Sequence, residues 1–197
     1  MKWTRRGLLL TPLSLLGVED WVAADGSPFP HASWQVTSEG LQSIGGLKIF
    51  QDIKTVKLYE DFEFSFEWKM QAEGNSGVKY QLVRWDKWQP PGLEGLHIRA
   101  RGQEMQLVDD AANPDAKKGP LKQCGSLYNF IAADHPARIA MDEYNTAKLV
   151  VKGMRTEHWI NGERLVAYEL KSKKPSAIAL QNHACNVWFR KLRISGG

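Results

Sequence analysis

Nine consecutive residues, Phe62 to Met70, alternate strictly between apolar and polar side chains. Successive side chains of a β-strand point to opposite faces of a sheet, whereas a helix with a period of 3.6 residues cannot separate such a sequence into two faces. One face of this segment carries Phe62, Phe64, Phe66, Trp68 and Met70, and the other carries only polar residues. The segment therefore predicts a long strand with one face against a hydrophobic core.

Other segments carry strand and turn signals. Gln103–Val108 alternates again, with Glu104 and Gln106 on one face and Met105 and Leu107 on the other. Asn161-Gly162 is a strong signal for a hairpin turn between two strands. Further strands are expected over Val78–Val83, Asn145–Lys152, Thr156–Ile160, Glu163–Leu170, Ile178–His183 and Asn186–Ile194. Many short strands with turns between them predict an all-β sandwich or barrel.

The connecting segments are rich in glycine, proline and polar residues. We expect a turn over Glu73–Gly77 and loops over Trp85–Gly95 and Asp109–Pro120. No segment shows a sustained helical period, although Gly125–Ala133 could form one helical turn.

A length of 197 residues suits one domain, which we place at residues 25–197. Residues 1–24 form either a secretory signal segment or the first strand. Arg5 and Arg6 precede a short apolar stretch, as in twin-arginine signals, so we expect export to the periplasm or the cell exterior. No stretch reaches the roughly 18 apolar residues that a membrane span needs.

Charge and cysteine content exclude several classes of function. The net charge is +4, and the 26 Lys and Arg are scattered, which argues against a nucleic-acid-binding face. Cys124 and Cys185 form either one disulfide or two free thiols. Asp109, Asp110 and Asp115 could hold calcium, but the spacing of a known calcium loop is absent, so we expect no cofactor.

The chain contains 8 Trp, a residue that either fills a core or offers a flat surface to a ligand. Trp85 and Trp88 lie in the predicted proline-rich loop, where an indole ring could stack on a sugar. Packing of a long loop would explain both residues equally well.

Six motifs occur in the order that is found in one protein family. They are Asn75–Tyr80, Glu104–Asp110, Asn113–Lys117, Gly125–Tyr128, Glu157–Gly162 and Leu180–His183 followed by Val187–Arg190. Over about Asp25 to Ile194 the chain resembles the 3-keto-disaccharide hydrolase domain family. The resemblance implies a concanavalin A-like jelly roll of two antiparallel sheets, found mostly in exported bacterial proteins. It also implies cleavage of glycosides whose sugar is oxidised at carbon 3.

The sequence departs from the family pattern at several positions. The family usually has Asp, Asp and Gly where this chain has Asn129, Asn182 and Ala184, and it has Asn in place of Lys191. Two acidic side chains of the family are therefore amides in this chain.

The polar faces of the predicted strands supply the candidate site residues. Glu67 with Lys69, Glu104 with Gln106, and Gln181 with His183 would converge if their strands line one sheet. We expect Glu104, His183 and Glu67 to be the catalytic residues. The expected substrate-binding residues are Lys69, Asn75, Gln106, Asp109, Gln181, Arg190 and Trp88.

These residue types suit glycoside chemistry. A carboxylate pair can run ordinary hydrolysis. In a 3-keto sugar, a base such as His183 or Glu104 can instead remove the proton on carbon 2, while Lys69, Gln106 or Arg190 stabilises the enolate. Because Arg190 shares its strand parity with Leu192 and Ile194, it could also be a buried charge paired with a carboxylate.

Two other functions remain open at this stage. The chain could be a non-catalytic carbohydrate-binding module of the same fold, which the Asp-to-Asn departures would fit. It could also be an interaction domain without a sugar site. Fold alone does not choose among them.

Overall fold

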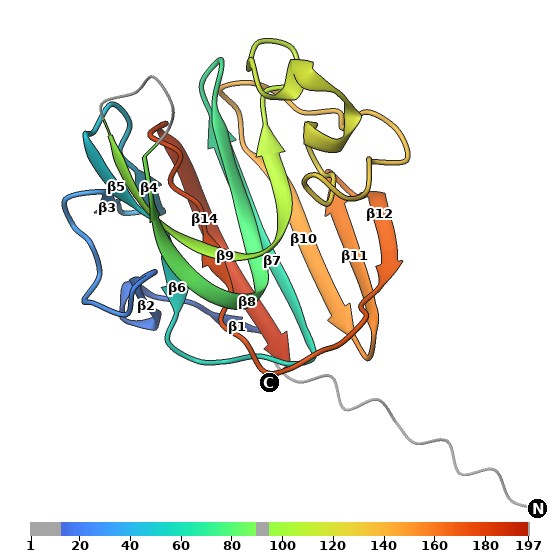
Figure 1. Cartoon of the computed structure of the whole chain (residues 1–197), viewed down its shortest axis with the longest axis horizontal. Helices are drawn as coiled ribbons and strands as arrows, with labels where there is room; N and C mark the ends of the chain where they lie inside the picture. Colours follow the sequence, from blue (N-terminus) through green and yellow to red (C-terminus); the bar gives the residue numbers. More distant parts are fainter. Residues whose placement is uncertain (1–12, 90–94, 197) are drawn as a thin grey trace, which may run out of the picture.

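Two β-sheets lie face to face in the computed structural model, which describes residues 13–89 and 95–196 (Figure 1). The larger sheet has eight strands in the order β12-β11-β10-β7-β14-β4-β3, with β1 beside β14. Its strands are β1 (Ser14–Leu15), β3 (Trp34–Val36), β4 (Gly40–Ser43), β7 (Phe62–Met70), β10 (Asn145–Lys152), β11 (Arg155–Ile160), β12 (Glu163–Glu169) and β14 (Val187–Gly196).

The smaller sheet has six strands in the order β2-β6-β13-β8-β9-β5. They are β2 (Trp21–Ala23), β5 (Ile49–Gln51), β6 (Ile53–Thr55), β8 (Asn75–Trp88), β9 (Leu96–Val108) and β13 (Ala179–Leu180). The prediction of an all-β sandwich is confirmed. One pairing, β5 with β9, is parallel, so the smaller sheet is not antiparallel throughout.

Within the described residues the only helical segments are three short 3₁₀ turns, η1 (Val18–Asp20), η2 (Ala116–Lys118) and η3 (Pro120–Lys122). The last two lie inside the long loop after β9. The expected helical turn over Gly125–Ala133 does not form, because Gly125 and Asn129 adopt positive φ angles of 80° and 66°, which a right-handed helix does not allow. No helix of the described part is long and apolar enough to cross a membrane.

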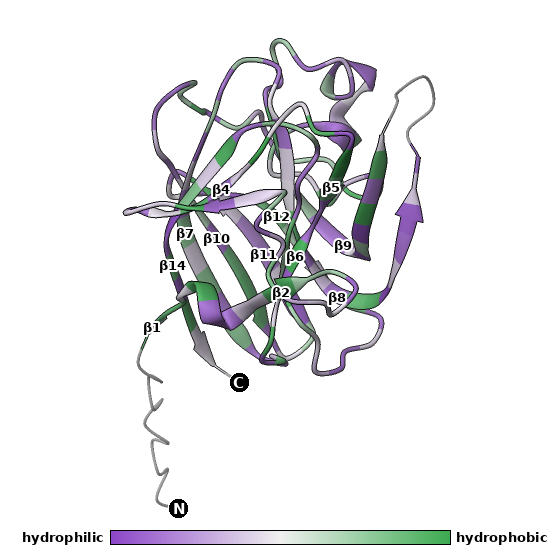
Figure 2. Ribbon diagram, turned by 90° about the vertical axis from the view of Figure 1, so that its left-hand side faces the viewer, coloured by the Kyte–Doolittle hydropathy of each residue, from purple (hydrophilic) through white to green (hydrophobic). Residues whose placement is uncertain are grey.

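The two sheets face each other, as Figure 2 shows from the side, and the core side chains lie between them. The alternation in β7 is confirmed, since the side chains from Phe62 to Met70 are alternately buried and partly exposed. From the smaller sheet, Val78, Tyr80, Met105 and Leu107 face the same core. Each fully buried large apolar side chain contributes on the order of 1.5–3 kcal/mol to folding, so this interlayer packing is the main source of stability.

Two predicted boundaries in the smaller sheet are wrong. Asn75, Ser76 and Gly77 belong to β8 rather than to a turn, because they pair with Val108, Leu107 and Gln106 of β9. The same hairpin continues through Trp85–Trp88, where a loop was expected. The remainder of that expected loop includes Pro90-Pro91-Gly92, which lies outside the described residues.

The N-terminal expectation falls partly outside the described residues, which begin at residue 13. From there, Ser14–Leu15 pairs with β14 and Trp21–Ala23 pairs with β6. Trp21 and Ala23 are buried in these pairings.

The smaller sheet bends within the β8–β9 hairpin. The ladder between β8 and β9 shifts register between Tyr80 and Arg84, and both strands curve there (Figure 1). The segment from β5 to β6 then passes from β9 to β13, with only Asp52 between the two strands. Asp52 therefore lies where the bent hairpin meets the rest of the sheet.

Candidate functional site

A pocket of about 400 Å³ opens on the face of the smaller sheet that points away from the core. Strand alternation produces it: Met105 and Leu107 face the core, whereas Glu104 and Gln106 line the pocket. In β8, Lys79 lies between the core residues Val78 and Tyr80 and points the other way. The bend of the β8–β9 hairpin and the loop after β9 form the walls.

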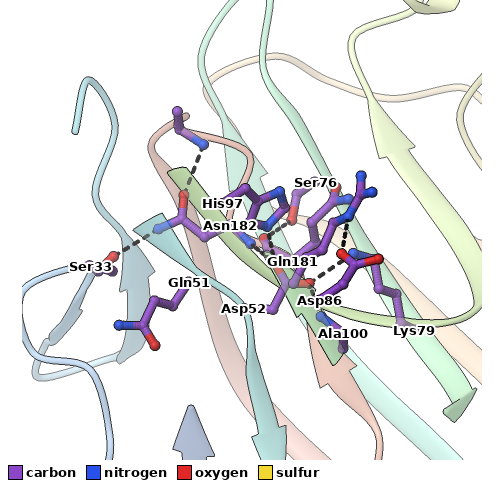
Figure 3. Close-up of polar contacts among 12 residues, drawn as sticks. Ser33, Gln51, Asp52, Ser76, Lys79, Asp86, His97, Ala100, Gln181 and Asn182 are labelled. Carbon is purple, nitrogen blue, oxygen red and sulfur yellow. Dashed lines mark hydrogen bonds and ion pairs between the residues drawn. The ribbon is translucent and has the colours of Figure 1, made fainter. Parts of the chain in front are cut away.

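Asp52 is the centre of the hydrogen-bond network at the pocket floor, as Figure 3 shows. Its carboxylate is 0% exposed and accepts four hydrogen bonds. The donors are Lys79 Nζ (2.8 Å), His97 Nε2 (2.7 Å), and the backbone N–H groups of Ala100 (3.0 Å) and Asn182 (3.1 Å). Although burial alone would raise the pKa of Asp52, the Lys79 ammonium and the His97 ring hold it at about 2.

Lys79 connects this network to Glu104. The Lys79 side chain is 4% exposed, and its Nζ lies 3.9 Å from Glu104 Oε2. Burial is the main factor that raises the pKa of Glu104, against the lowering effect of Lys79. A raised pKa makes the Glu104 carboxylate a stronger proton acceptor than an ordinary carboxylate, and the buried ammonium beside it can donate a hydrogen bond.

Two neighbours fix the position of Glu104. The Gln106 amide, oriented so that its nitrogen faces acceptors, donates to Glu104 Oε1 at 3.1 Å and to the Ser76 carbonyl at 3.2 Å. Gly77 lies beneath the Glu104 side chain, where a Cβ atom would approach Oε1 to 2.7 Å. The Glu104 carboxylate therefore occupies the space that a side chain at residue 77 would fill.

Two histidines and a tryptophan occupy one end of the pocket. Since a carboxylate only accepts hydrogen bonds, His97 Nε2 carries the proton that it donates to Asp52. The His97 ring lies 6.1 Å from that of His183 and 6.3 Å from that of Trp88. Burial, together with the charges of His97 and Lys79, lowers the pKa of His183 to about 4, so His183 is neutral near pH 7. The Arg99 guanidinium lies 4.4 Å from the centre of the Trp88 ring.

The loop after β9 forms the opposite wall. Tyr128 donates from its hydroxyl to Asp115 at 2.6 Å and accepts from Lys122 Nζ at 2.8 Å. Burial and the Asp115 carboxylate raise the pKa of Tyr128, so the phenol stays protonated. This wall presents a fixed hydroxyl and a carboxylate to the pocket.

The pocket lining therefore combines carboxylates, amides, imidazoles, an indole and cationic side chains, carried by a bent sheet and by the loop after β9. A family profile described as the 3-keto-alpha-glucoside-1,2-lyase-like domain matches residues 17–195. The chain belongs to this family.

Similar proteins agree with this assignment. A 3-keto-disaccharide hydrolase of Bacteroides thetaiotaomicron is 30% identical over 171 residues, which covers 69% of this chain and 58% of that protein. The chain thus spans less than two thirds of that relative. A Parabacteroides distasonis structure, provisionally assigned as a glycosyl hydrolase, has a TM-score of 0.73 at 24% identity and covers 91% of this chain and 89% of its own.

A carbohydrate-binding module, CBM66 of Bacillus subtilis, has a TM-score of 0.54 at 12% identity. The match covers 90% of this chain and 96% of that module. At this identity the similarity concerns the jelly-roll fold alone.

Six of the predicted site residues lie together in the pocket of this 3-keto-glucoside lyase-like domain. They are Asn75, Trp88, Glu104, Gln106, Gln181 and His183. Alternation along β8 and β9 brings most of them to one face. Their individual roles stay predictions.

Glu67 and Lys69 do not join them, so the expected convergence of all the polar faces is wrong. Both residues lie on β7, which belongs to the larger sheet, and their side chains point away from the core on that sheet. Glu67 accepts from Arg190 Nε and Lys191 Nζ, each at 2.6 Å. Lys69 Nζ lies 4.9 Å from the centre of the Trp188 ring.

Arg190 is on that outer face too, and its predicted burial is wrong. The ladder between β14 and β7 shifts register between Arg190 and Arg193, and Lys191 adopts a φ of 50°. This bulge adds one residue, so Arg190 points outward although Leu192 and Ile194 point into the core. Arg190 does have carboxylate partners, Glu67 and Glu39, but they are near the surface.

Asp109 organises the loop after β9 instead of lining the pocket. Its carboxylate accepts backbone hydrogen bonds from Glu73 (2.9 Å), Ala111 (3.0 Å) and Ala112 (3.2 Å). Within residues 13–89 and 95–196, no group of three or more acidic, histidine or cysteine side chains is arranged to hold a metal ion. Cys124 and Cys185 are both free thiols.

The departures from the family pattern have local explanations. Asn182 donates from its amide to the Ser33 carbonyl at 2.9 Å and accepts from Ala184 N at 2.9 Å, so it holds two segments together beneath the pocket. Ala184 has a φ of 57°, a conformation that glycine adopts without strain. Asn129 lines the pocket from a left-handed position, which asparagine tolerates.

Asp52, Lys79 and His97 were not among the site residues predicted from the sequence. Lys79 had a usable signal, because it occupies the same strand parity as Asn75 in a segment that is otherwise buried. Asp52 and His97 gave no local signal, since they meet only through the parallel pairing of β5 with β9.

Proposed function

We propose that this chain cleaves glycosides whose sugar is oxidised at carbon 3, at the pocket on the smaller sheet. The observation that carries the proposal is the arrangement of Glu104 and Lys79, 3.9 Å apart on the pocket floor. Asp52 accepts from Lys79 at 2.8 Å and serves as the counterion of the ammonium, which leaves the Glu104 carboxylate available as a base. A base and a cationic donor are thus available together.

The ketone determines the reaction. It acidifies the hydrogen on carbon 2, so the Glu104 carboxylate removes that proton and the electron pair moves to the ketone oxygen as an enolate. Lys79 donates a hydrogen bond to this developing negative charge. The enolate then reforms the ketone and expels the oxygen on carbon 1, which takes the proton from Glu104. Water adds across the resulting carbon–carbon double bond, so the products are the 3-keto sugar and the free alcohol.

The other pocket residues suit sugar recognition. Asn75, Gln106 and Gln181 supply amide groups, and Gln181 Oε1 is buried without a partner among the described residues. Trp88 supplies a ring face at the pocket end. His183, neutral at pH 7 because burial lowers its pKa to about 4, can accept a hydrogen bond from a sugar hydroxyl.

The test is release of 3-keto-glucose from 3-keto-trehalose and from 3-keto-glucosides of both anomers by the purified chain, with the unoxidised sugars as controls. Turnover confined to the keto forms supports the proposal. Solvent-derived deuterium at carbon 2 of product, in excess of exchange without protein, would support the elimination route. Binding without turnover would overturn it in favour of a non-catalytic carbohydrate-binding module.

A further inference from the structure

A second hollow adjoins the candidate site. This adjoining groove has a volume of about 960 Å³, and it runs between the bend of β8–β9 and the segment after β12. It shares Arg101, Gly102 and Phe130 with the pocket, so the two hollows meet along one ridge. A molecule held in the pocket can therefore extend into the adjoining groove.

Aromatic and aliphatic side chains line part of the adjoining groove. Phe130 is 73% exposed and Val83 is 68% exposed, while Tyr168 is partly exposed beside them. Large apolar side chains that face water next to a polar pocket are typical of a ligand-binding surface.

The exposure of Phe130 is fixed by its backbone. Leu127 and Ile131 exchange hydrogen bonds at 2.9 and 3.0 Å, and Phe130 N donates to the Leu127 carbonyl at 2.8 Å. Asn129 adopts a φ of 66° and donates from its N–H to the Leu121 carbonyl at 2.9 Å. This tight turn presents the Phe130 ring at the ridge between the two hollows.

The adjoining groove is also positively charged. Five cationic residues line it against a single acidic one, Glu169; the cations are Arg84, Arg101, Lys171, Lys173 and Lys174. Lys173 pairs with Asp61, and the two arginines share Asp86. Lys171 and Lys174 are exposed and have no ion pair within the described part of the chain. An anionic group in the groove would compensate these charges.

We propose that the adjoining groove binds the leaving group of the substrate, and that this leaving group is an aromatic aglycone carrying an anionic substituent. The proposal rests on the proposed function for the position of the sugar. The ring would lie against Phe130, and the anion would face Lys171 and Lys174. The preferred substrates are then aryl glycosides rather than simple alkyl glycosides.

The test compares three 3-keto-glucosides, those of 4-hydroxybenzoate, 4-hydroxybenzamide and methanol. Binding and kcat/KM are measured for the wild type, for Phe130→Ala, for the double variant Lys171→Gln/Lys174→Gln, and for the control Leu58→Ala on another exposed surface. Ratios of wild type to variant for each substrate cancel the different intrinsic reactivity of the leaving groups.

We expect Phe130→Ala to lower affinity and kcat/KM by about tenfold for both aryl glycosides and by less than about twofold for the methyl glycoside. The double lysine variant should lower affinity and kcat/KM only for the glucoside of 4-hydroxybenzoate. Leu58→Ala should leave both quantities unchanged for all three substrates. Equal effects on all three substrates would overturn the groove proposal even if turnover is robust. If no substrate is turned over, the proposed function fails, and the same ratios from binding still decide whether the groove recognises an anionic ring.

Discussion

The ammonium of Lys79 donates to the carboxylate of Asp52 at 2.8 Å, and neither side chain is more than 4% exposed. Burying an ion pair of this kind has a large desolvation cost. The Coulombic attraction offsets that cost only when further hydrogen bonds satisfy the remaining polar atoms of the pair. Here His97 and two backbone N–H groups donate the further hydrogen bonds to the Asp52 carboxylate. The pair therefore holds a positive charge on the pocket floor and joins β8, β9 and the segment after β13.

Replacing Asp52 with asparagine should destabilise the fold strongly. The change leaves Lys79 buried without an anionic partner, and breaking a buried pair typically costs about 3–5 kcal/mol. Urea unfolding measures the change in the free energy of unfolding. The control is Asp86→Asn, which removes a carboxylate that is 27% exposed and pairs with Arg84, Arg99 and Arg101, with an expected cost below about 1 kcal/mol. Similar losses in both variants would show that the buried pair contributes no special stability.

Replacing Glu104 with glutamine should reduce turnover of a 3-keto-glycoside by about 10²–10⁴-fold, because the general base is lost. Ligand affinity and circular dichroism should remain close to those of the wild type. The matched control is Glu67→Gln on the outer face of the larger sheet, which should leave kcat unchanged. A comparable loss of kcat in Glu67→Gln would contradict the location of the site.

The fold and part of the site could be predicted from local patterns. Period-two alternation identified β7, and it correctly separated Glu104 and Gln106 from Met105 and Leu107. Alternation assigns residues to one of two faces within a strand, but it does not say which sheet the strand joins. That is why Glu67 and Lys69 were grouped with Glu104 although β7 and β9 belong to different sheets.

The errors at Arg190 and Asp52 have other physical causes. A bulge at Lys191 inverts the parity of β14, and no local pattern in the sequence indicates that insertion. Asp52 meets Lys79 and His97 across sequence separations of 27 and 45 residues. Such contacts depend on the sheet order, which turn and strand signals leave open.

Unfolding should also depend on pH through two histidines. Burial is the main cause that lowers the pKa of both His158 and His183 to about 4, compared with 6.5 in an unfolded chain. Because the unfolded state takes up these protons first, the stabilising contribution is complete above about pH 6.5 and falls as the pH drops toward 4. Each histidine adds a slope of up to about 1.4 kcal/mol per pH unit.

The measurement for this pH dependence is the free energy of unfolding between pH 7 and pH 4 for the wild type and His183→Gln. We expect a shallower slope in the variant, since one titrating group is absent. Glu104 acts in the opposite direction, because burial raises its pKa, and it is present in both proteins, so it cancels in the comparison. Parallel curves would show that His183 titrates as it does in the unfolded chain.

Replacing Gly77 with alanine should disable the site with little effect on the fold. Gly77 pairs with Gln106 in regular β8–β9 geometry and needs no positive φ, so alanine meets no backbone strain. Its Cβ, however, would lie 2.7 Å from Glu104 Oε1 and 2.9 Å from Glu104 Cγ. The carboxylate must then leave the position in which it meets Lys79 and Gln106. Because a displacement of about 1 Å can cost on the order of 10²-fold in rate, kcat should fall far more than the midpoint of urea unfolding changes. Unchanged kcat in a folded Gly77→Ala variant would mean that the position of Glu104 does not govern the reaction.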